Sequence, residues 1–318
     1  MKQSRLDNFG WIATGVLVLA GCGSQTVPRS IGGQAPAQVS HSKSWMLPEA
    51  TGEDLIYALG GCDGICVISY PALKVVGSLP LVAGAACSDA RGNVFFAGLD
   101  KVTEYAHGGT QPIAILNLQG DDAFDCAVDP QSNDLAVVYE GNYGDVAVFT
   151  DRHRKRTNYD SHLASRFCGY DSKGNLFVDG YYGLGFGLSE LPKYAGAFTP
   201  FALPNSVGYP GQIQWDGKYI AYQGLGSVNT ISRIAVSGST ETAIVVETVN
   251  IKVRRHMAPS WLYDGNVVVP YRTHNIYPKV IGVFKYPTGG AATKTIRKFP
   301  PYKNRTLDFH GVTVSVAP

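Results

Sequence analysis

Two groups of charged residues in this 318-residue chain could do chemistry. The first is acidic: Asp121, Asp122 and Asp125 follow one another closely. The second is cationic and comes much later: Arg254, Arg255, His256, Arg272, His274 and Arg305, with His310 beyond them. Guanidinium and imidazole groups bind anions, and an imidazole can also transfer protons near neutral pH. Tyrosines, Tyr139 and Tyr181 among them, are interleaved, and aromatic rings beside cations suit sugars, small anions or a peptide strand.

Six cysteines offer a second kind of chemistry. Cys62 and Cys66 flank a short loop and could close a disulfide in an oxidising compartment. A zinc site there would need two further ligands, and none is obvious from the sequence. Cys87, Cys126 and Cys168 fall at nearly equivalent places in a repeat, where we expect buried thiols that act as small apolar side chains. A catalytic thiol would need a positioned histidine, which no spacing indicates.

A short repeated phrase indicates which elements carry these residues. CSDARGNVFFAG, CAVDPQSNDLAVV, CGYDSKGNLFVDG, IQWDGKYIAY and WLYDGNVVVP each join two apolar runs through an Asp-containing turn. The strands after the turns begin at Leu55, Val94, Leu135, Leu176, Tyr219 and Val267, at intervals of about 39 to 48 residues. We interpret the turn Asp as a hairpin cap that accepts backbone amide protons, since a calcium loop would need more oxygens.

The period predicts an all-β, six-bladed β-propeller with four strands per blade over residues 54–318. Each period contains about four β-rich runs separated by Gly, Asp and Asn turns. The first period, 54–82, has only three runs, and the C-terminal run 309–318 has no other partner. We therefore expect the C-terminal strand to pair with residues 54–82, completing blade one and closing the ring.

CAVDPQSNDLAVVY and CGYDSKGNLFVDG resemble degenerate NHL-type repeats. The resemblance covers 54–318, is weaker in the last two blades, and implies a six-bladed propeller of the NHL and gluconolactonase-like group. That ring serves binding proteins, lyases and lactonases alike, so the resemblance implies the fold more firmly than the activity.

In such a ring we expect ligands at one mouth of the channel. The loops that would build it are 119–124, 160–166, 204–211, 250–258 and 301–308, together with 60–64, 139–144, 180–187, 223–229 and 271–278. The predicted inner strands carry few oxygens, with Asp125, Gln212, Ser260 and His310 only at their ends. We therefore predict no metal site and no cofactor, and no spacing identifies catalytic residues.

The N-terminus predicts a cellular address. Lys2 and Arg5 precede WIATGVLVLA, an apolar run too short to span a bilayer but suited to a signal peptide. Leu19-Ala20-Gly21-Cys22 resembles the lipobox of bacterial lipoproteins, which implies a signal peptide over 1–21 and lipidation of Cys22. Residues 22–53 are rich in Ser, Gln, Gly and Pro and are expected to be a flexible linker.

These observations predict a lipid-anchored, extracytoplasmic binding or scaffold module of the cell envelope, in the outer membrane if the source is Gram-negative. Its expected partners are the membrane, through the lipid, and a protein, peptide or glycan; we expect a monomer. A net charge of +2 argues against nucleic acid. The alternative is an envelope lyase or hydrolase with its site at the channel mouth, using His256 or His310 as a base near Arg255. A structural envelope protein without a small ligand is a third possibility.

Overall fold

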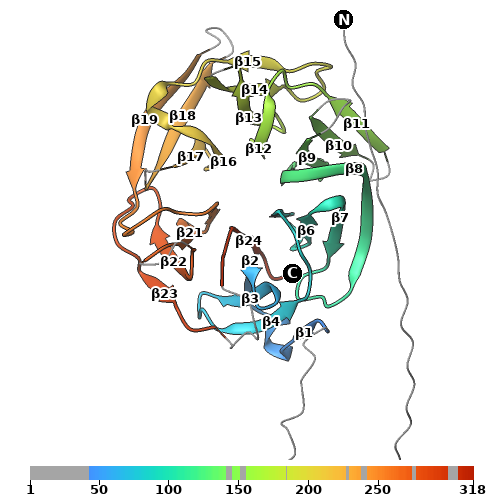
Figure 1. Cartoon of the computed structure of the whole chain (residues 1–318), viewed down its shortest axis with the longest axis vertical. Helices are drawn as coiled ribbons and strands as arrows, with labels where there is room; N and C mark the ends of the chain where they lie inside the picture. The colour runs from blue at the N-terminus through green and yellow to red at the C-terminus, as the bar shows by residue number, and fades with distance from the viewer. Residues whose placement is uncertain are drawn as a thin grey trace, which may run out of the picture. The chain divides into compact units, whose positions relative to one another are not determined.

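The fold is all-β. A computed structural model describes residues 43–140, 145–150, 155–183, 185–226, 229–237, 242–273, 277–299 and 307–318. Within these ranges the chain forms strands β1 to β24, two short 3₁₀ helices and no α-helix. The strands group into sheets that stand around a central axis, with β12, β16 and β24 near it (Figure 1).

The first sheet has the order β1-β4-β3-β2-β24. Its members are β1 (Trp45–Met46), β2 (Asp54–Gly61), β3 (Gly64–Tyr70), β4 (Val75–Leu79) and β24 (Gly311–Ser315). The C-terminal strand pairs antiparallel with β2, from Leu55 against Ser315 to Leu59 against Gly311, as the incomplete first period predicted. It takes the innermost place in the sheet.

The predicted linker extends too far into the folded body. Trp45–Met46 pairs with Ser78 and Gly77 of β4, and the 3₁₀ helix η1 (Pro48–Thr51) follows. Apolar side chains explain the correction, because Ala50 is fully buried and Met46 packs against the core. The body therefore begins before residue 54.

The second sheet has seven strands in the order β11-β10-β9-β8-β7-β6-β5. They are β5 (Ala85–Ser88), β6 (Val94–Ala97), β7 (Leu99–Tyr105), β8 (Pro112–Val128), β9 (Leu135–Glu140), β10 (Val146–Thr150) and β11 (Lys155–Tyr159). Residues 119–124, predicted to be a loop, instead lie within β8. The strand bends at Gln119 and Gly120, where φ is 62° and 94°, but pairing resumes at Asp122. One continuous strand thus replaces the expected break between two sheets.

Three four-stranded sheets complete the described fold. One contains β12 (Ala164–Tyr170), β13 (Leu176–Tyr182), β14 (Gly185–Leu191) and β15 (Thr199–Phe201), after which comes the 3₁₀ helix η2 (Asn205–Val207). The next contains β16 (Tyr209–Trp215), β17 (Ile220–Leu225), β18 (Thr230–Ser237) and β19 (Thr242–Asn250). The last contains β20 (Trp261–Tyr263), β21 (Asn266–Tyr271), β22 (Val280–Lys285) and β23 (Lys294–Ile296).

The core consists of apolar layers between neighbouring sheets. Successive residues of β2 contribute to different layers: Leu55 and Tyr57 pack with Phe96 of the second sheet, whereas Ile56 packs with Val268 of the last. Side chains alternate between the two faces of a strand, so a strand covered on both faces must be apolar throughout. This explains the continuous apolar runs after each turn.

The repeated turn Asp is a hairpin cap, as predicted. Oδ1 of Asp171 accepts the amide protons of Lys173 and Asn175 at 2.8 and 2.9 Å. Asp89 accepts those of Arg91 and Asn93 at 2.9 and 2.8 Å. Asp129 accepts the amide proton of Gln131 at 2.8 Å, and Asp216 accepts those of Lys218 and Tyr219 at 2.9 and 2.7 Å. These turns join the inner strand of a sheet to the second strand, and we call their side of the ring the turn face.

Buried polar side chains connect one sheet to the next. Oδ2 of Asp179 in β13 accepts the amide proton of Gly211 in β16 at 2.6 Å. Gln223 holds the corresponding place in β17: its Nε2 donates to the Ala258 carbonyl at 2.9 Å and its Oε1 accepts the Ser260 amide proton at 3.0 Å. Both side chains are almost fully buried. They fix the spacing of neighbouring sheets around the axis.

Candidate functional site

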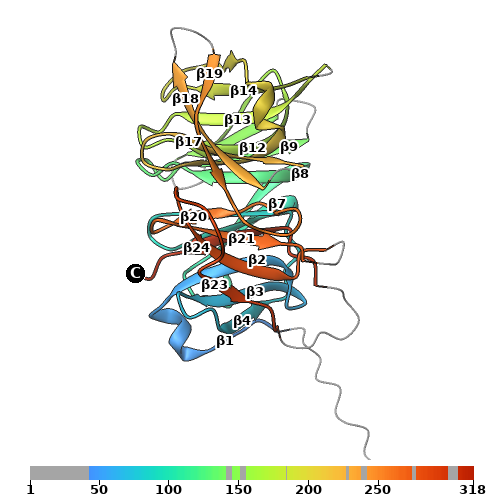
Figure 2. The same cartoon turned by 90° about the vertical axis from the view of Figure 1, so that its left-hand side faces the viewer.

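The side of the ring opposite the turn face carries the candidate site, and we call it the loop face. The innermost strand of each sheet begins on this face, and the strand paired with it ends there, because the two run antiparallel. Ala164 at the start of β12 lies opposite Tyr181 near the end of β13, and Tyr209 at the start of β16 lies opposite Leu225 at the end of β17. The loops from second to third strands and from outer to inner strands meet on this face. Figure 2 shows the sheets turned by 90° from the view down the axis.

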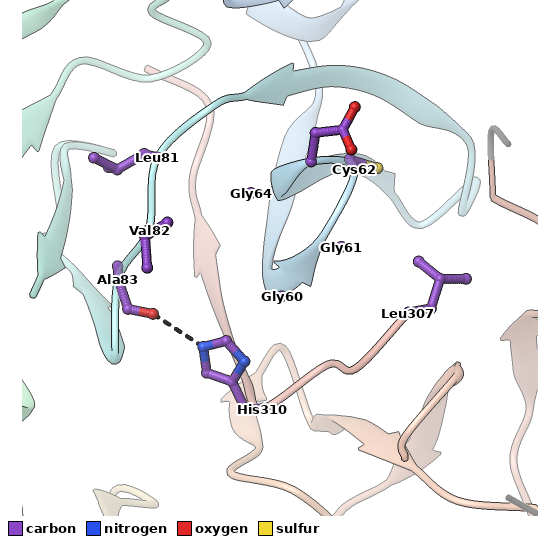
Figure 3. A pocket seen from close by; sticks show the side chains of 10 residues that line it. Gly60, Gly61, Cys62, Gly64, Leu81, Val82, Ala83, Leu307 and His310 are labelled. Carbon is purple, nitrogen blue, oxygen red and sulfur yellow. Dashed lines mark hydrogen bonds between the residues drawn. The ribbon is translucent and has the colours of Figure 1, made fainter. Parts of the chain in front are cut away.

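A cavity of about 140 Å³ lies on the loop face beside the β2–β3 loop (Figure 3). Its wall is formed by the glycine-rich segment 60–64, by Leu81–Ala83 and by Leu307 and His310. His310 Nε2 is 2.9 Å from the Ala83 carbonyl oxygen, which ties the C-terminal strand to the loop before β5. Val82 is 78% exposed at the rim. The wall is thus largely apolar and backbone-rich, with one imidazole and the carboxylate of Asp63.

The disulfide Cys62–Cys66 forms part of the same loop. Cys62 and Asp63 have positive φ values of 53° and 59°, so the backbone turns sharply between β2 and β3. A covalent link across this turn limits how far the loop can open. The cavity therefore has a stiff wall on the β2–β3 side.

A smaller cavity of about 20 Å³ lies where the inner strands begin, and it brings His310, Asp125 and Gln212 together. Asp125 Oδ2 accepts the amide proton of Cys168 at 3.0 Å and lies 3.4 Å from Gln212 Nε2. Burial raises the pKa of Asp125 to about 7, although these hydrogen bonds favour the ionised form. The cavity has room for about one water molecule.

Asp179 is a second buried carboxyl near the axis, and sequence reasoning missed it. Its Oδ1 accepts the Phe167 amide proton at 2.9 Å, in addition to its bond with Gly211. Burial raises the pKa of Asp179 to about 8. The repeat contained a signal for this residue. Asp179 is the fourth residue of β13 and Gln223 the fourth residue of β17, and each is a polar residue that interrupts an apolar run.

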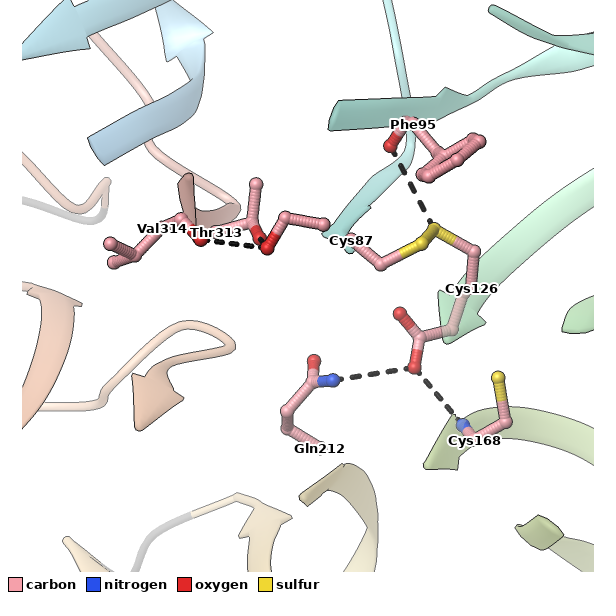
Figure 4. The surroundings of a disulfide bond; sticks show 9 residues. Cys87, Phe95, Cys126, Cys168, Gln212, Thr313 and Val314 are labelled. Carbon is pink, nitrogen blue, oxygen red and sulfur yellow. Dashed lines mark hydrogen bonds between the residues drawn. A yellow bond between two sulfur atoms is a disulfide. The ribbon is translucent and has the colours of Figure 1, made fainter. Parts of the chain in front are cut away.

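Towards the turn face, a cavity of about 320 Å³ follows the inner strands past Cys126, Cys168, Trp215 and Trp261. Cys87 and Cys126 are joined by a disulfide between β5 and β8 (Figure 4). The prediction that both are buried thiols is therefore wrong, although both are buried. Two inner strands approach closely enough at these equivalent places for a bond to form, with Cα atoms 5.6 Å apart.

Cys168 is a free thiol in the described part of the chain, and it is buried as predicted. Burial, followed by the negative charges of Asp125 and Asp179, raises its pKa well above the usual range. A thiol held protonated is a poor nucleophile. This environment argues against a catalytic role for Cys168.

The predicted cationic group is only partly assembled. The backbone amide of Arg272 donates to the His256 carbonyl at 3.1 Å, and Met257 forms an isolated antiparallel β-bridge with Tyr271. The segments around His256 and Arg272 are therefore neighbours. Arg255 and His256 are exposed, and His256 Nδ1 contacts the Gly226 carbonyl oxygen. His310 lies apart, at the two cavities described above. His274 and Arg305 lie outside the described residues, as does Cys22.

The predicted acidic group does not form one site. Asp121 binds Arg156, with Oδ2 3.1 Å from the guanidinium. Asp122 is exposed on β8, whereas Asp125 is buried at the axis. Alternation along β8 and an irregular register between Ala123 and Asp125 send these side chains in different directions. Only Asp125 reaches a cavity with other candidate residues.

Of the two tyrosines chosen from the sequence, only Tyr181 is accessible. Tyr139 is 1% exposed, and the Arg156 guanidinium lies 5.1 Å from its ring centroid. The prediction that Tyr139 contacts a ligand is therefore wrong. Tyr139 lies near the end of β9, a strand that is covered on both faces. Tyr181 is 39% exposed, and Tyr182 beside it 58%.

An arc of aromatic and cationic groups crosses the loop face, and sequence reasoning did not single out its centre, Arg166. The Arg166 guanidinium lies 4.1 Å from the ring centroid of Phe124 and 5.9 Å from that of Tyr181. Tyr209, 60% exposed, lies 6.3 Å from Phe186 between ring centroids. Only the contacts between sheets identify these residues as one surface.

Neither a metal centre nor a membrane span is found in the described ranges. No three His, Cys, Asp or Glu side chains there are grouped as a metal site requires. None of these residues forms a helix with the length and apolar character needed to cross a bilayer.

Comparison with known proteins gives the fold. No protein-family model matches the chain, and no curated protein does. A chain from the crystal structure of a nidogen/laminin complex is similar, with a TM-score of 0.61 and 12% identity over 83% of this chain and 98% of that one. A Bacteroides caccae protein of unknown function has a TM-score of 0.59 and 12% identity, over 83% and 99%. The β-propeller domain of Cps50 (Swd1) from Myceliophteria thermophila has a TM-score of 0.50 and 11% identity, over 81% and 86%.

The chain is therefore a β-propeller. One fold can carry many unrelated functions, so any activity must be argued from the loop face itself.

Proposed function

We propose that this chain is a lipid-anchored, extracytoplasmic β-propeller that binds a protein, peptide or glycan at the cell envelope through its loop face. Three parts of the proposal rest on different observations: the ring, the cellular address and the binding surface.

For the ring we propose six NHL-like blades. The strand order supports this count if β8 serves two blades: its first part pairs with β7 as an outer strand, and its last part pairs with β9 as an inner strand. The recurring Asp-capped turn supports the NHL-like character. The pairing of β24 with β2 supports closure.

The two disulfides support an extracytoplasmic address, because disulfides persist in oxidising compartments and are rare in the bacterial cytosol. The Leu-Ala-Gly-Cys sequence at 19–22 supports the lipid anchor. The test is fractionation of cells producing the chain or its Cys22→Ser variant. We expect the chain in the membrane fraction and the variant outside it; a variant that stays with the membrane would refute the anchor.

The observation that carries the binding proposal is the gathering of large, exposed apolar side chains on one face. Val82, Leu99, Tyr181, Tyr182, Tyr209 and Tyr277 all lie at the loop-face ends of their strands or in its loops, and each is at least 39% exposed. Arg166 and His256 stand among them. Exposed apolar patches rimmed by polar groups mark interaction surfaces, and Tyr with Arg dominates many of them.

Tyr181 and Tyr209 can be tested against a matched control. The purified chain would be applied to an array of immobilised envelope oligosaccharides and to a displayed peptide library. Affinity for any ligand found should fall about 10-fold or more in Tyr181→Ala and Tyr209→Ala, as expected for aromatic contacts worth about 1.5 kcal/mol or more. Tyr194, 96% exposed in the β14–β15 connection, lies on the turn face, so Tyr194→Ala should not change it. Equal loss in all three variants, or none, would refute the proposed surface.

An envelope lyase or hydrolase is the second candidate, favoured by one observation. Asp125 and His310 line one cavity, and a carboxyl with a pKa of about 7 is suited to proton transfer. A substrate would have to bind above this cavity, since it holds only about one water molecule. Turnover of an envelope polysaccharide that is abolished in both Asp125→Asn and His310→Ala would favour this candidate over a binding module.

A further inference from the structure

A basic groove lies on the outer rim of the propeller, away from the loop-face site. It has a volume of about 770 Å³ and is lined by Ala72–Val75 at the start of β4 and by Lys294–Lys298 along and after β23. These two segments lie near each other at the lower end of the body in Figure 2. Four of the lining residues, Lys74, Lys294, Arg297 and Lys298, are cationic and exposed, and none is Asp or Glu.

Several cations of the described chain are neutralised by carboxylates, whereas those of the groove are not. Arg156, Lys193 and Arg233 each bind a carboxylate within 3.1 Å. Among the described residues, no ion pair includes a cation of the groove; Lys294 Nζ donates to the Pro71 carbonyl oxygen at 3.0 Å. The groove therefore concentrates positive charge in a chain whose net charge is only +2.

Trp45 is exposed on the same side of the first sheet as the groove. In β1, Trp45 lies opposite Ser78, which lies opposite Cys66, and Cys66 packs in the layer shared with the last sheet. Residues opposite one another in a sheet share a face. Met46 lies opposite Gly77, and its side chain packs in the other layer, towards the second sheet. Trp45, 38% exposed, thus lies on the side of the first sheet that carries the basic groove.

We propose that this rim, formed by Trp45 and the four cations of the groove, docks on the surface of an anionic phospholipid bilayer. The proposal rests on the lipid anchor of the proposed function for its setting, because β1 is the first strand after the segment that would link the body to the lipid.

The chemistry of the rim fits a bilayer surface. Each Lys or Arg close to an anionic surface strengthens binding about five-fold, and Trp is favoured at the level of the head groups. Docking through the rim would leave the loop face, with Tyr181 and Tyr209, free for its own partner.

The test uses the mature chain, residues 22–318, with Cys22→Ser, so that no acyl chain contributes. Its partition onto vesicles of phosphatidylcholine alone is compared with an equimolar mixture of phosphatidylcholine and phosphatidylglycerol by co-sedimentation. We expect binding to the anionic vesicles only, weakened by added salt because exposed charges are screened. Lys294→Gln/Lys298→Gln should lower the partition coefficient about 30-fold. Trp45→Ala should lower it as well, without changing its dependence on salt.

Lys155→Gln/Lys173→Gln is the matched control, since it removes the same charge from exposed lysines on β11 and on a turn of the turn face. Its partition should equal that of the parent chain, and circular dichroism should show all variants folded. Equal loss in both double variants would reduce the effect to net charge and overturn the proposal.

Two other results would overturn it. One is no binding to anionic vesicles, or equal binding to neutral ones. The other is binding to a soluble polyanion such as heparin without binding to vesicles, which would assign the groove to a polyanion. These failures would leave the anchor standing, because fractionation of the Cys22→Ser variant in cells tests the anchor separately.

Discussion

Replacing Asp125 by Asn should make the protein more stable at alkaline pH than the parent chain. Asp125 is 2% exposed, and burial raises its pKa to about 7 from the usual value near 4. The folded chain therefore binds this proton more tightly than the unfolded chain. Because the carboxylate form is the one that burial disfavours, an amide of the same shape should be tolerated at this position.

The direction of the pH dependence follows from linkage. Below pH about 4 both states hold the proton, and the contribution of Asp125 to stability is fully present. As the pH rises towards 7, the unfolded chain loses the proton first, so the free energy of unfolding falls. Above the folded pKa of about 7 the loss is complete. A pKa difference of this size corresponds to roughly 4 kcal/mol.

The assay is urea denaturation followed by tryptophan fluorescence, at a series of pH values from about 4 to 9. The free energy of unfolding of Asp125→Asn should be close to that of the parent chain at the acidic end and exceed it by up to about 4 kcal/mol at the alkaline end. Asp179 is present in both chains, so most of its own contribution cancels. Asp122→Asn, an exposed change on the same strand, is the control and should follow the parent chain throughout.

Two results would refute this reasoning. A difference between Asp125→Asn and the parent chain that does not change with pH would mean that Asp125 titrates alike in both states. A variant less stable than the parent chain at alkaline pH would mean that the hydrogen bonds from Cys168 and Gln212 outweigh burial and hold the carboxyl ionised.

Three further predictions concern stability. Removing the Cys87–Cys126 disulfide by Cys87→Ala/Cys126→Ala should lower the free energy of unfolding by about 4 kcal/mol, since it closes a loop of 39 residues, and urea curves with and without reductant would show whether the loss disappears in the reduced chain. Gln223→Leu should cost about 2 to 4 kcal/mol in the same assay, because the Ala258 carbonyl and the Ser260 amide lose a buried partner. Gln223→Glu keeps an acceptor for the Ser260 amide but can donate to the Ala258 carbonyl only when its carboxyl is protonated, so it should recover stability only where the carboxyl is neutral. Asp171→Ala should lower the thermal midpoint by the loss of about 1 to 2 kcal/mol of turn hydrogen bonding, while Asp171→Asn, which keeps an acceptor oxygen, should restore most of it.

Much of the strand order could be predicted because it follows from local chemistry. Asp171 caps its turn through residues two and four positions later in the chain, so the repeat announces the hairpin wherever it occurs. The C-terminal strand could be placed because the first period lacked a strand. The bend in β8 could not, since Gln119 and Gly120 look like any loop and only pairing on both sides shows a continuous strand.

The candidate site was predicted less well, because it depends on contacts between sheets. Tyr139 and Tyr181 both end second strands, yet one is buried beside Arg156 and the other is exposed near Arg166. Cys87 and Cys126 lie one repeat apart, and their pairing depends on how closely two inner strands approach. No local pattern encodes these distances.

The pairing of β24 with β2 also bears on how the protein reaches its final state. Ala317 N donates to the Asp54 carboxylate across 263 residues of sequence, so the first sheet contains some of the most distant contacts in the chain. The inner edge of β2 stays unpaired until β24 has formed beside it. Unpaired edges invite association with other chains, and non-local pairing is slow. We therefore expect the chain to be most prone to association with other chains during this interval.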